Sequence, residues 1–140
     1  MAVAPLLLIL NDGLGQQQPV LSWPSREPMV FLIAVVFAPI TEEWIFRGWL
    51  WRWLAQRFPQ DAPDKGTRDS LLVASFVSPT NLSSTVLFAL LHGLTRGPET
   101  ALLVIVPSLY LGAIRLHGGH WLICAMVHAI WNYCWFATSI

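Results

Sequence analysis

Glu42 and Glu43 are adjacent carboxylates that lie, with Arg47, inside an apolar run from Met29 to Trp51. An ionised group at hydrocarbon depth costs about 2.5–3.5 kcal/mol on insertion scales, so a charge in such a run predicts a functional site. Glu43 and Arg47 are spaced i and i+4 and can neutralise each other on one helix face. Glu42 has no such partner in its own segment. It therefore needs partners from elsewhere in the chain.

Two later segments carry polar groups that suit Glu42. His92 follows Phe88 by one helical turn, and His128 precedes Asn132 by one turn. Hydrolysis of an amide by water needs a base that takes the proton of the water and donors aimed at the developing oxyanion. Glu42 can be that base, and a neutral His92 can share the water and relay the proton. His128 and Asn132, on one helix face, can form the oxyanion site.

Other interpretations of the same residues remain open. Taken alone, His92 is typical of a hydrogen-bonded residue at the end of a span, and His128 with Asn132 is typical of contacts between membrane helices. One carboxylate and two histidines can also ligate zinc and leave a position for water. The sequence has no His-Glu-x-x-His and no Gly-x-Ser-x-Gly motif, which argues against a zincin and a nucleophile-elbow hydrolase.

The composition is that of a membrane protein. Hydrophobic residues make up 55% and charged residues 11% of the 140 residues, whereas soluble domains have about 25% charged residues. The mean hydropathy is +0.56. The formal net charge of +0 gives no reason to expect a nucleic-acid partner. Since a spanning helix needs about 20 residues, the chain has room for about four.

The apolar runs predict an all-α, polytopic transmembrane helix bundle that forms a single membrane domain over residues 1–140. An N-terminal apolar and loop segment, 1–27, precedes a helical core over 28–137. Pro39 predicts a kink or break in the first helix, whose freed backbone groups need partners from neighbouring helices. Pro79 predicts a break before a short helix. The expected helices span residues 28–57, 82–92, 98–116 and 121–137.

Lysine and arginine in the connections indicate the orientation of the chain. The connection after the first predicted helix holds Arg52, Arg57, Lys65 and Arg68, so it is expected on the cytoplasmic side. Both termini then lie outside. On this topology Glu42 lies towards the cytoplasmic half of the membrane.

Three motifs carry a resemblance to a known family. They are Glu42-Glu43-Trp44-Ile45-Phe46-Arg47, Phe88-Ala89-Leu90-Leu91-His92 and His128-Ala129-Ile130-Trp131-Asn132. In this order, on hydrophobic helices, they resemble the CAAX prenyl protease and bacteriocin-processing family of membrane proteins, also called CPBP or Abi. The resemblance covers roughly residues 36–136, and it includes Leu111-Gly112 in the third predicted helix.

The resemblance implies an intramembrane endopeptidase that acts on a CAAX-type or bacteriocin-type peptide or protein substrate at the lipid bilayer. Carried over by motif, Glu42 and His92 would activate the water, and His128 and Asn132 would stabilise the oxyanion. No cofactor is expected, with a zinc-dependent version of the protease as an alternative. A non-catalytic bacteriocin-immunity or peptide-binding membrane protein is the other alternative. The residues expected to support the site are Glu43, Arg47 and Phe88.

The resemblance also implies a setting for the protein. The expected location is the plasma membrane of a bacterium, as a multi-pass protein, and an oligomer is left open. Family members usually carry further helices before the first motif, and here residues 1–27 stand in that place. The sequence is therefore expected to be a fragment, a minimal member or a subunit of an oligomer.

Overall fold

The computed structural model describes residues 28–59 and 74–138. These residues are helical throughout apart from short connections, and no strand occurs among them, as the sequence predicts. The predicted N-terminal segment and most of the connection after the first helix lie outside the described residues. The fold class is therefore all-α in the described part of the chain.

The first helix runs without a break from Pro28 to Arg57. Two stretches of it are π-helical, a form in which each N–H bonds the carbonyl five residues back and which is frequent at functional sites. Of the predicted kink or break at Pro39, the break does not occur, because wider turns take up the proline while the helix continues. Its segments are α3 (Pro28–Phe31), η2 (Leu32–Phe37), α4 (Ala38–Glu43), η3 (Trp44–Leu50) and α5 (Trp51–Arg57).

Three further helices follow, α7 (Pro79–Arg96), α8 (Pro98–Leu116) and α9 (Trp121–Thr138). The helix expected over 82–92 is longer at both ends. The break predicted at Pro79 is present, because Ser78 separates helical residues 74–77 from α7. The helix after it begins at Pro79 itself, since a first-turn N–H has no partner within the helix and a proline is tolerated there. Ser78 caps this end, and its Oγ accepts a hydrogen bond from the Asn81 backbone N–H at 3.1 Å.

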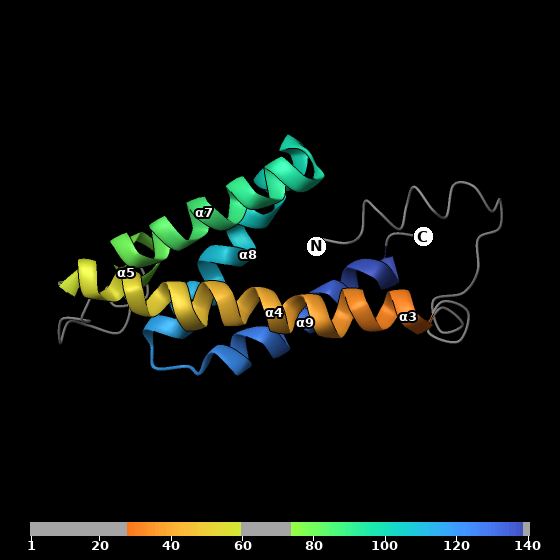
Figure 1. Cartoon of the computed structure of the whole chain (residues 1–140), viewed down its shortest axis with the longest axis horizontal. Coiled ribbons are helices and arrows are strands. Elements are labelled where there is room, and N and C mark those ends of the chain that lie inside the picture. Colours follow the sequence, from red (N-terminus) through yellow and green to blue (C-terminus); the bar gives the residue numbers. More distant parts are fainter. Residues whose placement is uncertain (1–27, 60–73, 139–140) are drawn as a thin grey trace.

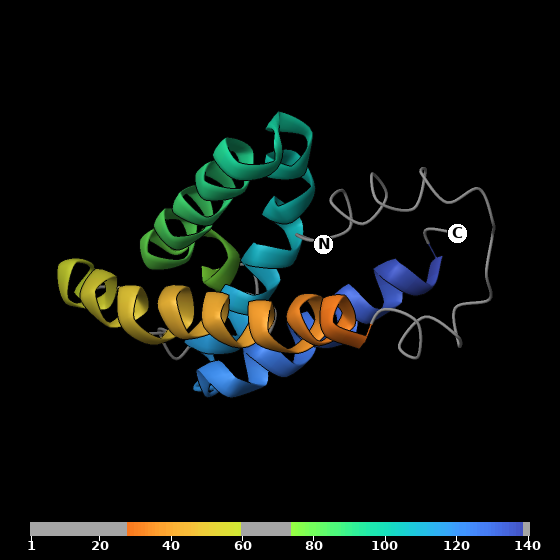
Figure 2. The ribbon, with the colours of Figure 1, turned by 45° about the vertical axis from the view of Figure 1, so that its right-hand side comes forward.

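The helices form two antiparallel pairs (Figures 1 and 2). α9 lies along the first helix, and α8 turns back along α7. Gly97 makes the reversal between α7 and α8 with φ of +94°, a backbone conformation that favours glycine. Segments far apart in the sequence, α4, α7 and α9, thereby come together at the middle of the molecule.

A buried amide fixes α7 against α8. Asn81 Nδ2 donates hydrogen bonds of 2.9 Å to the carbonyls of Ser75 and Leu109. Gly112 makes room for it, because a Cβ there would lie 1.7 Å from Asn81 Oδ1. The Leu111-Gly112 pair noted in the sequence thus has a steric reason.

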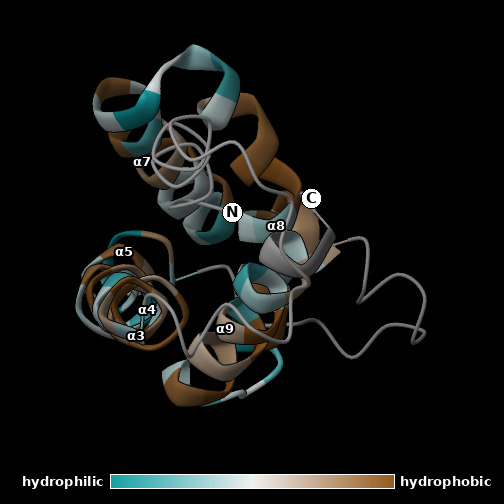
Figure 3. Cartoon of the chain, turned by 90° about the vertical axis from the view of Figure 1, so that its right-hand side faces the viewer, coloured by the Kyte–Doolittle hydropathy of each residue, from teal (hydrophilic) through white to brown (hydrophobic). Residues whose placement is uncertain are grey.

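The outside of the described part is strongly apolar. Large hydrophobic side chains such as Met29, Trp49, Leu102 and Val106 are more than half exposed. Apolar residues, brown in Figure 3, recur along the helices of the described part. Two helices in this part, Pro28–Arg57 and Pro98–Leu116, are long and apolar enough to cross a membrane. An exposed apolar surface of this extent is typical of contact with lipid.

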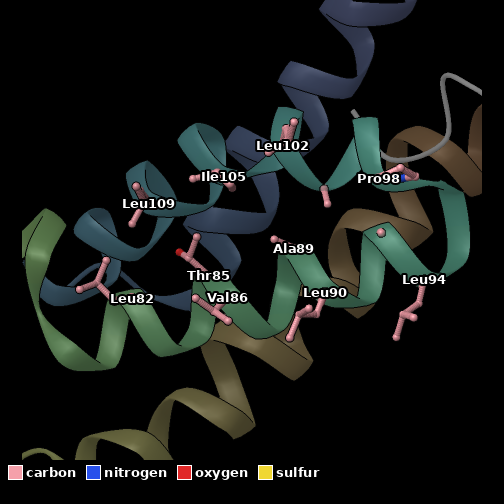
Figure 4. A pocket seen from close by; sticks show the side chains of 12 residues that line it. Leu82, Thr85, Val86, Ala89, Leu90, Leu94, Pro98, Leu102, Ile105 and Leu109 are labelled. Atoms are coloured by element: carbon pink, nitrogen blue, oxygen red, sulfur yellow. The ribbon is translucent and has the colours of Figure 1, made fainter.

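An apolar groove of about 460 Å³ lies between α7 and α8 (Figure 4). Leu82, Val86 and Leu90 contribute to it from α7, and Leu102 and Ile105 from α8. At 100° per residue these α7 side chains lie on a different face from the one that carries the motif of the second segment. The groove is therefore separate from the polar cluster described next.

Candidate active site

Three helices bring one carboxylate and two imidazoles to a single point. Glu42 Oε2 lies 3.8 Å from His92 Nε2 and 3.8 Å from His128 Nε2. Glu42 comes from α4, His92 from α7 and His128 from α9. Both histidines are buried, and the Glu42 side chain keeps 17% of its surface exposed. The carboxylate therefore sits at the accessible edge of an otherwise enclosed site.

The Nδ1 atom of each imidazole has a hydrogen-bond partner. His92 Nδ1 donates to the Phe88 carbonyl at 2.8 Å, because a carbonyl oxygen can only accept. His128 Nδ1 donates to Glu43 Oε1 at 2.9 Å. A neutral imidazole has a single N–H, so both Nε2 atoms present a lone pair to Glu42. Neither His92 Nε2 nor Glu42 Oε2 has a hydrogen-bond partner among the described residues.

The i, i+4 pair predicted from the spacing is present. Arg47 Nε lies 3.2 Å from Glu43 Oε2, and Arg47 Nη1 donates to Glu43 Oε1 at 3.3 Å; both side chains are fully buried. Arg47 Nη2 also donates to the carbonyl and the hydroxyl of Ser108 on α8, at 2.9 and 2.6 Å. Glu43 thus joins the guanidinium to His128, and the pair ties the first helix to both α8 and α9.

The Phe88 ring forms the apolar centre of the cluster. Its centroid lies 4.2 Å from that of His92 and 4.9 Å from that of Phe46. The Arg47 guanidinium carbon lies 5.0 Å above the same ring, within the range of a cation–π contact. Phe88 therefore holds the orientation of His92 by its ring as well as by its backbone carbonyl.

A comparison with protein families covers the stretch of the chain that carries these site residues. The family model for Rce1-like type II CAAX prenyl endopeptidases matches residues 24–134. The chain belongs to this family. No curated protein and no solved structure shows a significant match.

Family membership places the chain among CAAX-type intramembrane endopeptidases. The protein is thus a membrane-embedded protease in general terms, with a peptide substrate at the membrane. The apolar exterior and the two helices long enough to span agree with that setting. All the residues that the motifs single out lie within the matched range.

In this Rce1-like protein, Asn132 hydrogen-bonds the first helix next to Pro39, a residue that has no backbone N–H. In η2 the Ala38 N–H bonds the Ile33 carbonyl, five residues back. The same pattern would bond the Ala34 carbonyl to residue 39, but Pro39 has no N–H. Asn132 Nδ2 donates to Ala34 O instead, at 2.9 Å. The freed backbone group at the proline thus has the neighbouring partner that the sequence predicts it needs.

Replacement of Asn132 by Ala is expected to lower the free energy of unfolding by about 1–3 kcal/mol, since it leaves a buried carbonyl unbonded. A Pro39→Ala change in the same chain supplies a backbone N–H and should recover most of this stability. Peptide cleavage that stays low in the double variant would assign Asn132 a role beyond this bond. Thermal unfolding and cleavage by the two single variants and the double variant measure this. Additive losses of stability would contradict the assigned bond.

The donor atoms around Glu42 are of the types that zinc accepts, but their spacing is wide. Zinc–ligand distances of about 2.0–2.2 Å place tetrahedral ligands about 3.4 Å apart, and the carboxylate–imidazole separations here are 3.8 Å. Within residues 28–59 and 74–138 no group of three His, Cys, Asp or Glu side chains could hold a metal ion. As placed, the Glu42 oxygen and the two imidazole nitrogens are wider apart than ligands of one zinc ion.

Arg96 is a member of the cluster that the sequence analysis missed. Its Nη2 lies 3.9 Å from Glu42 Oε1. The expected helix ended at His92, which left Arg96 in a turn, whereas α7 continues to Arg96. The spacing of four residues from His92 is the signal that could have placed both on one face.

Proposed function

We propose that this chain hydrolyses a peptide bond at the membrane with a water molecule activated by Glu42. The observation that carries the proposal is the convergence of Glu42 Oε2 with the two Nε2 atoms, at 3.8 Å each. These separations are too long for direct hydrogen bonds. A water molecule beside Glu42 Oε2 can donate one hydrogen to the carboxylate and the other to His92 Nε2, and it suits a polar separation of this length.

The first step forms the tetrahedral intermediate. Glu42 Oε2 takes a proton from the water as the water oxygen bonds the carbonyl carbon, and the carbonyl electron pair moves onto its oxygen. In the second step the proton passes from Glu42, by way of His92 Nε2, to the amide nitrogen. The C–N bond then breaks and releases an acid and an amine. No cofactor enters these steps.

His128 and Asn132 supply hydrogen bonds to the oxyanion in this proposal. His128 donates through Nε2 when it enters the cycle with a second proton taken up from solvent, because Nδ1 is committed to Glu43; in the neutral form its Nε2 accepts instead. Asn132 has two amide hydrogens, one of which bonds the Ala34 carbonyl. Glu43, Arg47 and Phe88 position these groups and do not react.

The proposal extends to the setting of the site. A bundle of about four spans, with Glu42 towards the cytoplasmic half of a bacterial plasma membrane, follows from the loop charges and the motif order. The substrate is a CAAX-type or a bacteriocin-type peptide. Binding without cleavage, as in an immunity protein, is the rival that a mutational test separates.

The direct test uses the purified full chain and an internally quenched, farnesylated CAAX peptide. We expect cleavage of the peptide, with the products identified by mass, and no loss of rate when a strong chelator is added. Metal analysis of the same sample is the second measurement. Stoichiometric zinc that is lost and regained together with the activity would overturn the metal-free mechanism. No cleavage of farnesylated or unmodified peptides would overturn the proposed function.

A further inference from the structure

Arg96 is a cation at the mouth of the Glu42 site that the proposed chemistry does not yet use. Its guanidinium faces Glu42 Oε1 through Nη2 at 3.9 Å, a distance beyond that of a good charge-assisted hydrogen bond. Its Nη1 is buried and has no hydrogen-bond partner among the described residues. The side chain is 27% exposed. A buried N–H of a charged group with no acceptor is costly, so this atom calls for an anionic or carbonyl oxygen.

The charge balance of the reaction indicates where that oxygen arises. In the resting site Arg96 is the nearby counterion of Glu42, while Arg47 is paired with Glu43. When Glu42 takes the proton of the water it becomes neutral, and the negative charge moves to the substrate oxygen. Among the residues that the structure describes, Arg96 then has that oxygen as its only nearby negative charge. The permanently charged guanidinium of Arg96, beside the base Glu42, thus faces the negative charge that has moved to the substrate oxygen.

The other donors near the site are partly committed. Neutral His128 carries its hydrogen on Nδ1, which bonds Glu43. One Asn132 hydrogen bonds the Ala34 carbonyl. An arginine, in contrast, keeps its charge and all five N–H donors in proteins. Arg47, the other arginine of the cluster, is committed to Glu43 and Ser108, which leaves Arg96 as the permanently charged donor next to Glu42.

We propose that Arg96 is a further catalytic residue, whose Nη1–H donates to the oxyanion of the tetrahedral intermediate. This inference rests on the proposed function. The group forms no covalent bond and transfers no proton. As the charge leaves Glu42, the guanidinium exchanges a weak contact with Oε1 for a hydrogen bond to the substrate oxygen. When the C–N bond breaks, the charge on that oxygen is lost and the resting contact returns.

The test compares Arg96→Gln and Arg96→Lys with the parent protein on the farnesylated CAAX peptide. Loss of one oxyanion donor lowers kcat by about 10²- to 10³-fold, and we expect this for Arg96→Gln with KM changed less than threefold, a criterion for a contact made in the transition state. Arg96→Lys, which keeps the charge but loses the planar fork, should retain an intermediate kcat. Arg52→Gln removes an exposed cation from the first helix and is the matched control, with kcat unchanged.

A second readout separates this role from a structural one. A phosphonate analogue of the peptide carries a tetrahedral anion, so its affinity should fall in Arg96→Gln in proportion to kcat/KM. Binding of the uncleaved peptide to a Glu42→Gln protein should not change when Arg96→Gln is added. A normal kcat, or a raised KM with normal kcat, in an Arg96→Gln protein with an unchanged unfolding midpoint overturns the inference alone. A parent protein that cleaves no peptide overturns the inference together with the proposed function.

Discussion

Replacement of Glu42 by Gln is expected to abolish measurable peptide cleavage while the protein stays folded in the membrane. The amide keeps the shape of the carboxylate but cannot take the proton of the water. General-base catalysis contributes about 10²- to 10⁴-fold to a rate, and the loss should be at the upper end because no other carboxylate of the described residues faces both imidazoles. Initial rates on the farnesylated CAAX peptide measure the effect.

The matched control for this variant is Glu99→Gln. Glu99 is an exposed carboxylate in the first turn of α8, so its loss removes the same charge away from the cluster and should leave the rate unchanged. Cleavage at the normal rate by Glu42→Gln would show that Glu42 is not the base. Peptide binding by both Glu42→Gln and the parent, with cleavage by neither, would favour the non-catalytic immunity or peptide-binding protein.

Replacement of Arg47 by Ala is expected to reduce the amount of folded protein strongly. The change leaves Glu43 buried without its counterion, and removal of one partner of a buried pair costs about 3–5 kcal/mol. It also removes the hydrogen bonds to Ser108 that join the first helix to α8. The yield of monodisperse protein in detergent and its unfolding midpoint are the measurements. Arg52→Ala, at an exposed position of the same helix, should change neither.

A compensating variant makes the Arg47 prediction specific. Arg47→Met together with Glu43→Gln removes both charges at once and should recover a large part of the folded yield, since replacement of both partners is often nearly neutral. Its cleavage rate should stay low, because a glutamine amide holds His128 less firmly than the carboxylate does. Equal yields for Arg47→Ala and the parent would contradict a supporting role for the pair.

Contacts within one helix could be predicted from the sequence, and contacts between helices could be predicted only in part. The Glu43–Arg47 pair follows from i, i+4 spacing alone. The contact between His128 and Glu43 joins residues 85 positions apart. The motif order indicates that α9 faces the first helix. It does not show which of the two adjacent carboxylates, Glu42 or Glu43, accepts the hydrogen bond from His128 Nδ1. That assignment depends on the helix rotation, which packing sets.

The effects of Pro39 and Pro79 could likewise be predicted only in part. The sequence predicts that Pro39 frees a backbone carbonyl, because the ring lacks an N–H. It does not show that Asn132 is the donor that bonds Ala34 O, or that the helix continues through π-helical turns. The break predicted at Pro79 is present, but the helix after it was predicted to begin at Leu82 and begins at Pro79. The Ser78 cap sets this start, and the extension of α7 at its other end is what brings Arg96 to Glu42.

The pairing of Glu43 with Arg47 inside one helix also bears on the order in which the protein assembles. The two side chains meet as soon as the turn between them forms, before any other helix is present. The first helix can therefore enter the bilayer with this pair of charges already neutralised. Glu42 gains its partners only when α7 packs against the first helix. Helix α7 carries both Arg96, the counterion of Glu42, and His92, four residues apart on one face. In the proposed mechanism the site needs α4, α7 and α9 together, so we expect a chain that has inserted only its first helices to cleave no peptide.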